Sequence, residues 1–489
     1  MKRLIVVSLV LLLAFSVFAQ GAKEETKAVS SAATKDNPTV ITCVIKDVSD
    51  YLEMLDKMEV LLAEDGIYVD FQPVEIQEGS YADAVSLMLQ SGNIPDLIYF
   101  QGGDYQFGVT QGILEDLRPY IQSSKNLKNT LGAHSLARLE NYPYLLWNST
   151  PGNKVPLVRQ DWFDQMDTAD SLVADPTPEN YLAFMRELKA KFTSKTVFTC
   201  QGATDGLYEL DMVFGQAFGD SQSWVKDKDG KYIYKNVSDN ELKKLEFYAQ
   251  LYKEGLFDNE YLTKKYSAKE QAFYTGEAGI VVGTQNTVVP KYENKMIAAN
   301  NENATLHVLP PAKGPDGVQA LKPVAIDKET RGWAISKYSK NKQLVFDILD
   351  WLAGGKGALL DQYGFEGVHY EITADGKLKV LDDSWWPRFH ESLSGYDVGM
   401  EIIGQVPLGA KPIMAKATEM ANASLILDNS FAIPDELSTE WDAATLVYKE
   451  FAADFVAGKK TSADWKAFVA EWNAMGGKAV TDYANKILK

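Results

Sequence analysis

The sequence predicts an α/β protein built from two lobes. The first observation is the order strand, helix, strand, helix, strand between residues 39 and 100, which predicts a parallel sheet with right-handed crossover helices. The second is the length of 489 residues, which exceeds what one hydrophobic core usually serves. The third is that later segments continue this style without repeating any sequence at a fixed period. We therefore expect two α/β lobes.

The first lobe begins with three short strands. Apolar and β-branched residues predict buried strands at 39–45, 69–74 and 97–100. Apolar residues at helical spacing predict helices at 51–63 and 81–89 between these strands.

Further elements follow the same two patterns. A turn at Asp227–Gly230, between Trp224 and Tyr232, predicts a β-hairpin. We also predict helices at 179–191, 240–254, 342–352 and 441–456, and strands at 278–283 and 305–308.

The N-terminus has the pattern of an export signal. Lys2 and Arg3 precede an apolar run from Leu4 to Phe18, and Ala19 is small. This pattern predicts a secretory signal peptide at residues 1–19, since the run is short for a bilayer span of ~20 residues. A retained membrane anchor is the alternative. Residues 20–37 are small and polar and predict a flexible leader.

The two cysteines, Cys43 and Cys200, both lie far beyond residue 19. No cysteine is therefore present at the signal cut for acylation, and we expect a periplasmic protein that is not a lipoprotein at that position. Both cysteines have apolar neighbours, which predicts buried free thiols. A disulfide remains open because an exported protein meets an oxidising compartment.

The overall charge limits the class of partner. The formal net charge is −18, which argues against binding to nucleic acid or anionic lipid, because both require clustered Lys and Arg. The chain has 10 Trp and 24 Tyr. Such side chains are mostly core residues, but their flat apolar faces also stack on sugar rings.

Several stretches in order resemble the family 1 extracellular solute-binding proteins of ABC importers. The branch that they resemble handles oligosaccharides and includes alginate- and maltose-binding proteins. Individual features are Pro95-Asp96 before an apolar strand and the Gly364-x-Glu366-Gly367 signature. The matching stretches are Met88–Phe100, Leu114–Ile121, Val158–Asp164, Leu251–Phe257, Phe273–Gly279 and Tyr363–Tyr370.

This resemblance implies a periplasmic-binding-protein-like fold, with hinge strands joining the lobes and a ligand cleft between them. Each lobe is then discontinuous: residues 38–155 plus 309–375 form the first, and 156–308 plus 376–489 the second. The implied function is the capture of a carbohydrate, an oligosaccharide, by cleft closure and its delivery to a membrane permease. We expect a monomer whose partners are the sugar and the ABC permease, with no cofactor.

One feature of the alginate-binding relatives is missing. Those relatives carry a calcium loop after the helix that corresponds to 179–191, but Lys191–Val197 lacks the carboxylates that a hard cation needs. Asp227–Gly230 lacks the later acidic ligands of a calcium loop. We therefore expect no metal.

Candidate ligand residues are aromatic side chains beside polar groups in loops at strand ends. Asp161-Trp162 is our first choice, although the resemblance also permits packing against the hinge. Trp224 lies where relatives place a stacking tryptophan. Three further pairs follow strands or place aromatic rings side by side: Asp104-Tyr105, Gln285-Asn286 and Trp385-Trp386.

The remaining candidates are Arg331, Tyr363 and Glu366. Arg331 precedes Trp333 and offers a cation beside an aromatic ring. Tyr363 and Glu366 belong to the family signature, whose residues can equally serve to hold the lobe together.

The main alternative is an exported polysaccharide-acting enzyme, a glycosidase or lyase. A glycosidase needs two carboxylates at a defined separation, but 67 acidic residues supply such pairs by chance. The sequence has no serine-nucleophile elbow, zinc-binding His-Glu-x-x-His or phosphate-binding glycine loop. We therefore expect binding rather than catalysis. An envelope scaffold is a second alternative, but its repeats are absent from the sequence.

Overall fold

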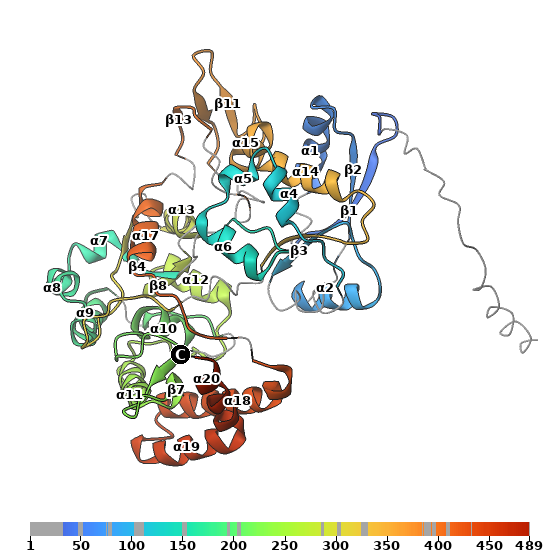
Figure 1. The fold of residues 1–489 in the computed structure, drawn as a ribbon. Helices are drawn as coiled ribbons and strands as arrows, with labels where there is room; N and C mark the ends of the chain where they lie inside the picture. The colour runs from blue at the N-terminus through green and yellow to red at the C-terminus, as the bar shows by residue number, and fades with distance from the viewer. Residues whose placement is uncertain are drawn as a thin grey trace, which may run out of the picture.

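A computed structural model of the chain groups its elements into two lobes (Figure 1). The expected signal peptide and most of the leader lie outside the described residues. The described residues are 33–46, 52–74, 76, 81–101, 112–148, 154–192, 196–202, 207–284, 288–300, 305–323, 331–383, 385, 393, 398–406, 411–431 and 433–488.

A four-stranded sheet of order β10-β3-β1-β2 organises the first lobe. Its strands are β1 (Thr39–Val44), β2 (Val69–Pro73), β3 (Leu97–Gln101) and β10 (Arg331–Ile335). Strands β2 and β3 run parallel to β1, whereas β10 runs antiparallel to β3. The helices of this lobe are α1 (Leu52–Glu64), α2 (Tyr81–Gln90), α4 (Arg118–Ser123), α5 (Leu127–Thr130), α6 (Ala133–Asn141), α14 (Lys342–Leu352) and α15 (Gly355–Tyr363).

Alternate residues of these strands enter different cores. In β3, Leu97 packs with residues of α1 and α14, whereas Ile98 and Phe100 pack with residues of α2. In β10, Trp333 joins the first core and Ala334 the second. Because side chains alternate across a strand, the sheet is covered on both faces. This explains why the residues of β3 from Leu97 to Phe100 are apolar in succession.

A second four-stranded sheet, of order β5-β8-β4-β9, organises the second lobe. Its strands are β4 (Lys154–Arg159), β5 (Thr196–Phe198), β8 (Ala278–Thr284) and β9 (Leu306–Val308). Strand β5 is parallel to β8, whereas β4 is antiparallel to both β8 and β9. The helices around it are α7 (Gln160–Phe163), α8 (Ala169–Ala174), α9 (Pro178–Phe192), α10 (Tyr208–Phe214), α11 (Asp239–Lys253), α12 (Tyr266–Tyr274), α13 (Val288–Asn300) and α17 (Pro412–Ala423).

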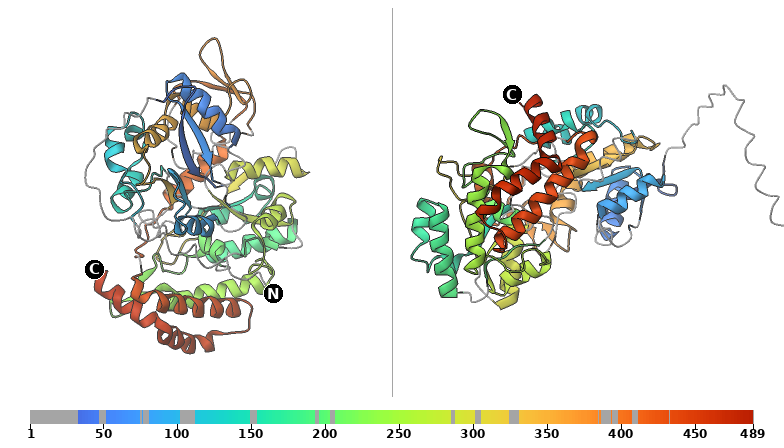
Figure 2. Two further views of the ribbon diagram at one scale, coloured as in Figure 1. Left: turned by 90° about the vertical axis from the view of Figure 1, so that its right-hand side faces the viewer. Right: turned by 90° about the horizontal axis from the view of Figure 1, so that it is seen from below.

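Three C-terminal helices gather at one end of the second lobe (Figure 2). They are α18 (Ser438–Val456), α19 (Trp465–Trp472) and α20 (Lys478–Ile487). Nearby lies the hairpin β6 (Trp224–Lys226) and β7 (Tyr232–Tyr234). A separate small sheet beyond α15 contains β11 (Tyr370–Ile372), β12 (Leu378–Val380) and β13 (Ile402–Gly404). Short helical turns complete the described elements: η2 (Lys235–Val237), η5 (Asp435–Leu437), η6 (Ser462–Asp464) and the π-turn η7 (Asn473–Gly477).

The predicted elements are all present within a few residues of their expected bounds, but the packing places the lobe boundaries elsewhere. Leu309 and Ala312 belong to the core of the second lobe, and Leu321 donates its N–H to Ser424 of that lobe at 3.2 Å. Strand β12 pairs with β11 next to α15. We therefore assign 309–323 to the second lobe and strands β12 and β13 to the first.

The cysteines lie in different lobes and are both free and fully buried. Cys43 is in β1 and Cys200 follows β5. No helix of the described chain combines the length and the apolar character needed to cross a bilayer.

Candidate functional site

The chain crosses between the lobes at one particular edge of each sheet. It leaves the first lobe at Asn148 and starts β4 at Lys154, and it returns from Pro323 to Arg331, the first residue of β10. Six residue steps span at most about 20 Å, so the two edges lie close to one another. Each is the edge at which parallel strands end, which is where α/β sheets bind ligands.

On the first lobe, Arg331 and Trp147 lie at this edge. Arg331 pairs with Gln101, the last residue of β3, and its guanidinium lies 5.3 Å from the ring centre of Trp147. Arg138 donates from Nη2 to the carbonyl oxygen of Arg331 at 2.6 Å. Asn148, only 6% exposed, accepts from the N–H of Gly132 at 3.1 Å. The edge is thus held in place by buried polar contacts.

On the second lobe, the buried carboxylate of Glu209 organises the edge. Oε1 of Glu209 accepts from Nζ of Lys269 at 2.8 Å and from Nζ of Lys154 at 3.1 Å. Oε2 accepts from the N–H of Gln201 at 2.9 Å. Burial lowers the pKa of Lys269, although Glu209 acts in the opposite direction. Lys154 is the residue opposite Thr284 at the end of β8, so the network sits at the strand ends.

Tyr208, beside Glu209, presents a partly exposed ring at the same edge. Nζ of Lys322 lies 3.9 Å from its ring centre, and Nζ of Lys154 lies 5.1 Å from it. Lysine ammonium groups are attracted to the negative face of an aromatic ring. The side chains therefore form an aromatic surface flanked by cations, which suits a polar ring-shaped ligand.

Asp161 and Trp162 lie at the opposite edge of the second sheet. They follow the end of β4, which is antiparallel to β8, and Trp162 stacks on Phe192 at a centroid distance of 5.0 Å. Asp161 is paired with Arg159 at 2.6 Å. We therefore remove this pair from the candidate site. The direction of β4 depends on the strands that it pairs with, so the sequence could not show at which edge Asp161 and Trp162 lie.

Trp224 is buried in an aromatic cluster. Its side chain is 2% exposed and stacks on Phe431 at 5.3 Å, while Tyr234 meets it edge-on at 5.1 Å. A ring with no exposed face cannot stack on a sugar in this conformation. The expected ligand role of Trp224 is thus replaced by a packing role that joins the hairpin to the C-terminal helices.

The family-signature residues hold a turn of the first lobe. The Phe365 N–H donates to Nδ1 of His369 at 3.0 Å, and Nε1 of Trp385 donates to the carbonyl of Asp361 at 2.8 Å. A Cβ at Gly364 would lie 2.7 Å from both the His369 and Trp385 rings, so only glycine fits there. These contacts give Trp385 a structural role.

Tyr363 meets Tyr370 edge-on at 6.2 Å, whereas Glu366 is exposed. Arg331 faces Trp147, while the Trp333 that we expected beside it is 1% exposed in the core. The candidates Asp104, Tyr105, Gln285, Asn286 and Trp386 lie outside the described residues.

Sequence reasoning missed Tyr208, Glu209, Lys154, Lys269 and Lys322. Tyr208 and Glu209 follow β5 after a short loop, and the rule that ligands bind at the ends of parallel strands could have identified them. The lysines had no local signal, because they come from β4, α12 and the segment after β9.

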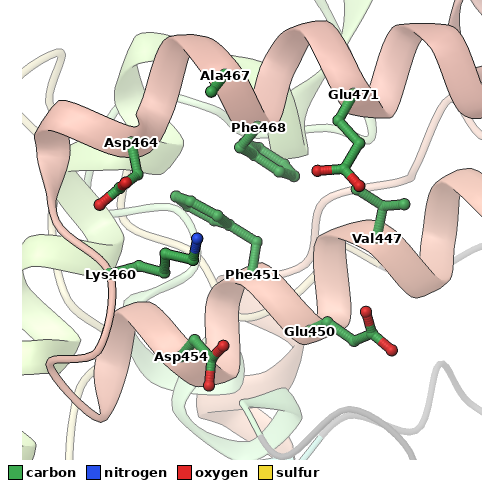
Figure 3. A pocket seen from close by; sticks show the side chains of 9 residues that line it. All are labelled: Val447, Glu450, Phe451, Asp454, Lys460, Asp464, Ala467, Phe468 and Glu471. Carbon is green, nitrogen blue, oxygen red and sulfur yellow. The ribbon is translucent and has the colours of Figure 1, made fainter.

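A hollow of about 240 Å³ lies between α18 and α19 (Figure 3). Phe451 and Phe468 stack in it at 4.2 Å, and its rim is formed by Glu450, Asp454, Lys460, Asp464 and Glu471. Its lining residues belong to α18, α19 and the segment between them, away from the edges where the chain crosses. We therefore do not assign it to the ligand. Within the described part of the chain, no three His, Cys, Asp or Glu side chains are grouped to hold a metal.

The structure is similar to several solved binding proteins. It matches the alginate-binding protein AlgQ2 without calcium ion, with a TM-score of 0.64, 17% identity and coverage of 93% of this chain and 99% of that one. An extracellular solute-binding protein from Bifidobacterium longum subsp. infantis matches with a TM-score of 0.64 and 16% identity. The match covers 93% of this chain and 98% of that one. The N-glycan transport solute-binding protein NgtS from Streptococcus pneumoniae matches with a TM-score of 0.63 and 15% identity, over 92% of this chain and 98% of that one. These likenesses show the two-lobed fold.

Two relatives are similar in sequence. An uncharacterised protein of Niallia circulans is 25% identical over 261 residues, which are 50% of this chain and 98% of the relative. Lipoprotein LipO of Bacillus subtilis (strain 168) is 21% identical over 341 residues, 63% of this chain and 62% of the relative.

The family model described as bacterial extracellular solute-binding protein matches residues 55–358. That match covers more than half of the chain and spans both sheets described above. The chain therefore belongs to the bacterial extracellular solute-binding protein family.

Proposed function

We propose that this protein captures a carbohydrate, an oligosaccharide, outside the cytoplasmic membrane and delivers it to the permease of an ABC importer. The observation that carries the proposal is the family match over residues 55–358. The matched region includes strands of both sheets, and the chain crosses between the lobes at the edge of each sheet where the parallel strands end. Support for the ligand class comes from structural neighbours whose names describe alginate and N-glycan binding. The solute stays chemically intact, because the role of such a protein is capture.

The proposed site combines Arg331 and Trp147 of the first lobe with Tyr208, Lys154 and Lys322 of the second. Aromatic faces cover the C–H surface of a sugar, and charged groups satisfy hydroxyls that lose water. A ligand that touches both edges favours the closed arrangement, since only differential affinity shifts such an equilibrium. Gln285, Asn286, Asp104, Tyr105 and Trp386 remain proposed contacts, as do the signature residues Tyr363 and Glu366.

The proposal extends to the location and assembly of the protein. An export signal at residues 1–19 fits an extracellular family, and the absence of a cysteine near Ala19 fits a protein without acylation there. We take the working form to be a monomer that meets its permease when loaded.

A thermal-shift screen of the protein, expressed from residue 20, against mono- and oligosaccharides tests the function. A sugar present at a hundred times its dissociation constant should add ~2.7 kcal/mol to the free energy of unfolding. Mass spectrometry of the recovered sugar should find it unchanged. No shift with any carbohydrate, or conversion of a glycan into product, would overturn the proposal.

A further inference from the structure

A second aromatic ring lies at the strand-end edge of the second lobe. Tyr266 is the first residue of α12 and is 40% exposed. Helix α12 leads into β8 through a short turn at residues 275–277. Nζ of Lys269, one turn into the helix, donates to the carbonyl oxygen of Val282 near the end of β8 at 3.3 Å. The start of α12 therefore lies beside the end of β8, at the edge where the chain crosses between the lobes.

Buried neighbours hold the ring of Tyr266 in place. Nζ of Lys269 lies 4.5 Å from the ring centre, and the Tyr266 hydroxyl lies 3.3 Å from the hydroxyl of Tyr292. Lys269 is fully buried and Tyr292 is 1% exposed. Burial also raises the pKa of Tyr266, so the exposed part of its side chain is chiefly the ring. An aromatic surface fixed in this way can stack on a sugar with little loss of conformational entropy.

One buried carboxylate connects Tyr266 with Tyr208. Oε1 of Glu209 accepts from Nζ of Lys269 at 2.8 Å and from Nζ of Lys154 at 3.1 Å. The first ammonium group lies 4.5 Å from the centre of the Tyr266 ring, and the second lies 5.1 Å from the centre of the Tyr208 ring. The two ring centres are thus no farther apart than these four distances laid end to end. They form two separate surfaces, because the rings belong to different helices with Glu209 between them.

Two aromatic surfaces at one edge match a chain of sugars better than a single sugar. Each ring can cover the C–H surface of one sugar unit. Tyr208 lies beside both crossings of the chain, because Lys154 starts the strand after the first crossing and Lys322 precedes the second. Tyr266 lies on the other side of Glu209, beside α12. A sugar chain that starts at the crossings and follows this edge therefore meets Tyr208 first and Tyr266 next.

We propose that Tyr266 is a second sugar-stacking residue, so that one unit of an oligosaccharide lies on Tyr208 and a later unit of the same chain lies on Tyr266. This inference rests on the proposed carbohydrate-binding function and narrows its substrate class to chains of at least two units. Tyr208 contributes to the binding of every sugar, whereas Tyr266 contributes when the chain is long enough to reach it. Tyr266 is thus the residue that selects for chain length.

Calorimetric titration with sugars of increasing length tests the inference. The probes are homologous series of one to four units, built from glucose, mannose, galactose, fructose and the unit that makes up the sugar with the largest thermal shift. We expect at least one series to bind. Its affinity should rise by about fivefold or more from the one-unit sugar to the four-unit chain, as an added aromatic contact predicts.

Variants assign the length dependence to Tyr266. Tyr266→Leu keeps an apolar side chain but removes the ring, and should weaken binding of the four-unit chain by about fivefold or more. Binding of a shorter member of the same series should change by less than about twofold. Tyr266→Phe keeps the ring and should bind all members within about twofold of the original protein. Tyr338→Leu is the control, since Tyr338 is 64% exposed and follows β10 at the opposite edge of the first sheet.

Melting curves confirm that each variant folds, and Tyr266→Gln replaces Tyr266→Leu if the latter does not. The inference is wrong if longer chains bind no more tightly than the one-unit sugar, or if loss of the ring leaves the affinity for the four-unit chain unchanged or lowers affinity equally at every length. In each of these cases sugar binding itself leaves the proposed function intact. Binding of no sugar at all would overturn both.

Discussion

At the scale of the residue, the carboxylate of Glu209 holds three segments of the second lobe together. Its carboxylate joins Lys154 of β4, Lys269 of α12 and the N–H of Gln201 after β5. Lys269 is fully buried. A buried ammonium without its carboxylate bears a desolvation cost that nothing offsets.

Replacing Glu209 by Ala should therefore lower the free energy of unfolding by about 3–5 kcal/mol. The double variant Glu209→Met with Lys269→Met should recover a large part of that loss, because no unpaired buried charge remains. Urea unfolding followed by circular dichroism measures both. If the double variant is less stable than Glu209→Ala, the loss does not come from the stranded lysine.

The contacts of single residues were the hardest feature to predict from the sequence. Arg331 could be expected at a strand end beside an aromatic ring, but the ring is Trp147 and not its sequence neighbour Trp333. Trp224 had the right residue type beside a predicted hairpin, yet it is buried by Phe431 and by the C-terminal helices, some 200 residues further along the chain. Such contacts leave no local pattern.

At the scale of elements, Asp350 of α14 fixes a loop of the first lobe. Its carboxylate accepts from three successive backbone N–H groups, those of Lys125 at 2.9 Å, Asn126 at 3.0 Å and Leu127 at 2.8 Å. Since these groups precede and start α5, a residue on one helix satisfies the free donors of another.

Asp350→Ala should destabilise the protein by about 2–4 kcal/mol, because several buried N–H groups lose their acceptor at once. Asp347→Asn, an exposed change on the same helix at a side chain that accepts a hydrogen bond from Gln343, should cost less than about 0.5 kcal/mol. Thermal unfolding compares the two. Equal melting temperatures for both variants would contradict this role of Asp350.

Glu187 similarly joins the turn before α8 to helix α9. Burial raises the pKa of Glu187, but hydrogen bonds from Lys191, Thr168 and the N–H of Asp167 outweigh it and lower the pKa to about 2. Because the pKa lies below its ordinary value of 4.5, the ionised group stabilises the fold above pH 4.5. That stabilisation is lost as the pH falls from 4.5 to about 2.

Glu187→Gln should thus reduce the loss of stability over this acid range by about 1–2 kcal/mol, allowing for solvent screening near the surface. Urea unfolding measured at several pH values between 2 and 5 provides the test. Glu179→Gln on the same helix, where the carboxyl is exposed, is the control and should leave the pH profile unchanged. An unchanged profile in Glu187→Gln would show that this carboxyl is not responsible.

Elements were predictable because their signals are local. Apolar runs identified β1, β3 and β8, and helical spacing gave α14 its bounds. The direction of β4 was not predictable, because it depends on which neighbour the strand pairs with. Because the direction of β4 was unknown, we expected Asp161 and Trp162 at the ligand-binding edge of the second sheet, whereas they lie at the opposite edge.

At the scale of the whole molecule, length and the repeated α/β pattern predicted two lobes, and the resemblance predicted their discontinuity. The boundaries depended on packing: residues 309–323 lie on the second lobe because Leu309 and Leu321 enter its cores. Cys43 and Cys200 fall in different lobes for the same reason, each inside its own core.

The thiols should consequently be free and unreactive in the folded state. Burial raises the pKa of Cys43 to about 12 and also raises the pKa of Cys200, and thiolate is the reactive form. Ellman's reagent should find almost no thiol in native protein and two thiols after unfolding in guanidinium. Fewer than two after unfolding, without reductant, would indicate a disulfide.

Closure of the lobes around a sugar also requires that residues of both lobes contact the sugar. Arg331→Gln in the first lobe and Tyr208→Ala in the second should each weaken binding by about tenfold or more, as for a lost charged or stacking contact. Calorimetry with the sugar that gives the largest thermal shift measures this, and Lys337→Met, exposed on the first lobe, is the control. If either variant binds the sugar with unchanged affinity, the substituted residue does not contact the sugar, and the proposed contribution of its lobe is wrong.

Small-angle X-ray scattering with and without that sugar tests most directly whether the lobes enclose a guest. A smaller radius of gyration at saturation, with one sugar bound per chain and recovered intact, is the predicted result. An unchanged radius at full occupancy would contradict it, since binding would then proceed without bringing the two sheet edges together.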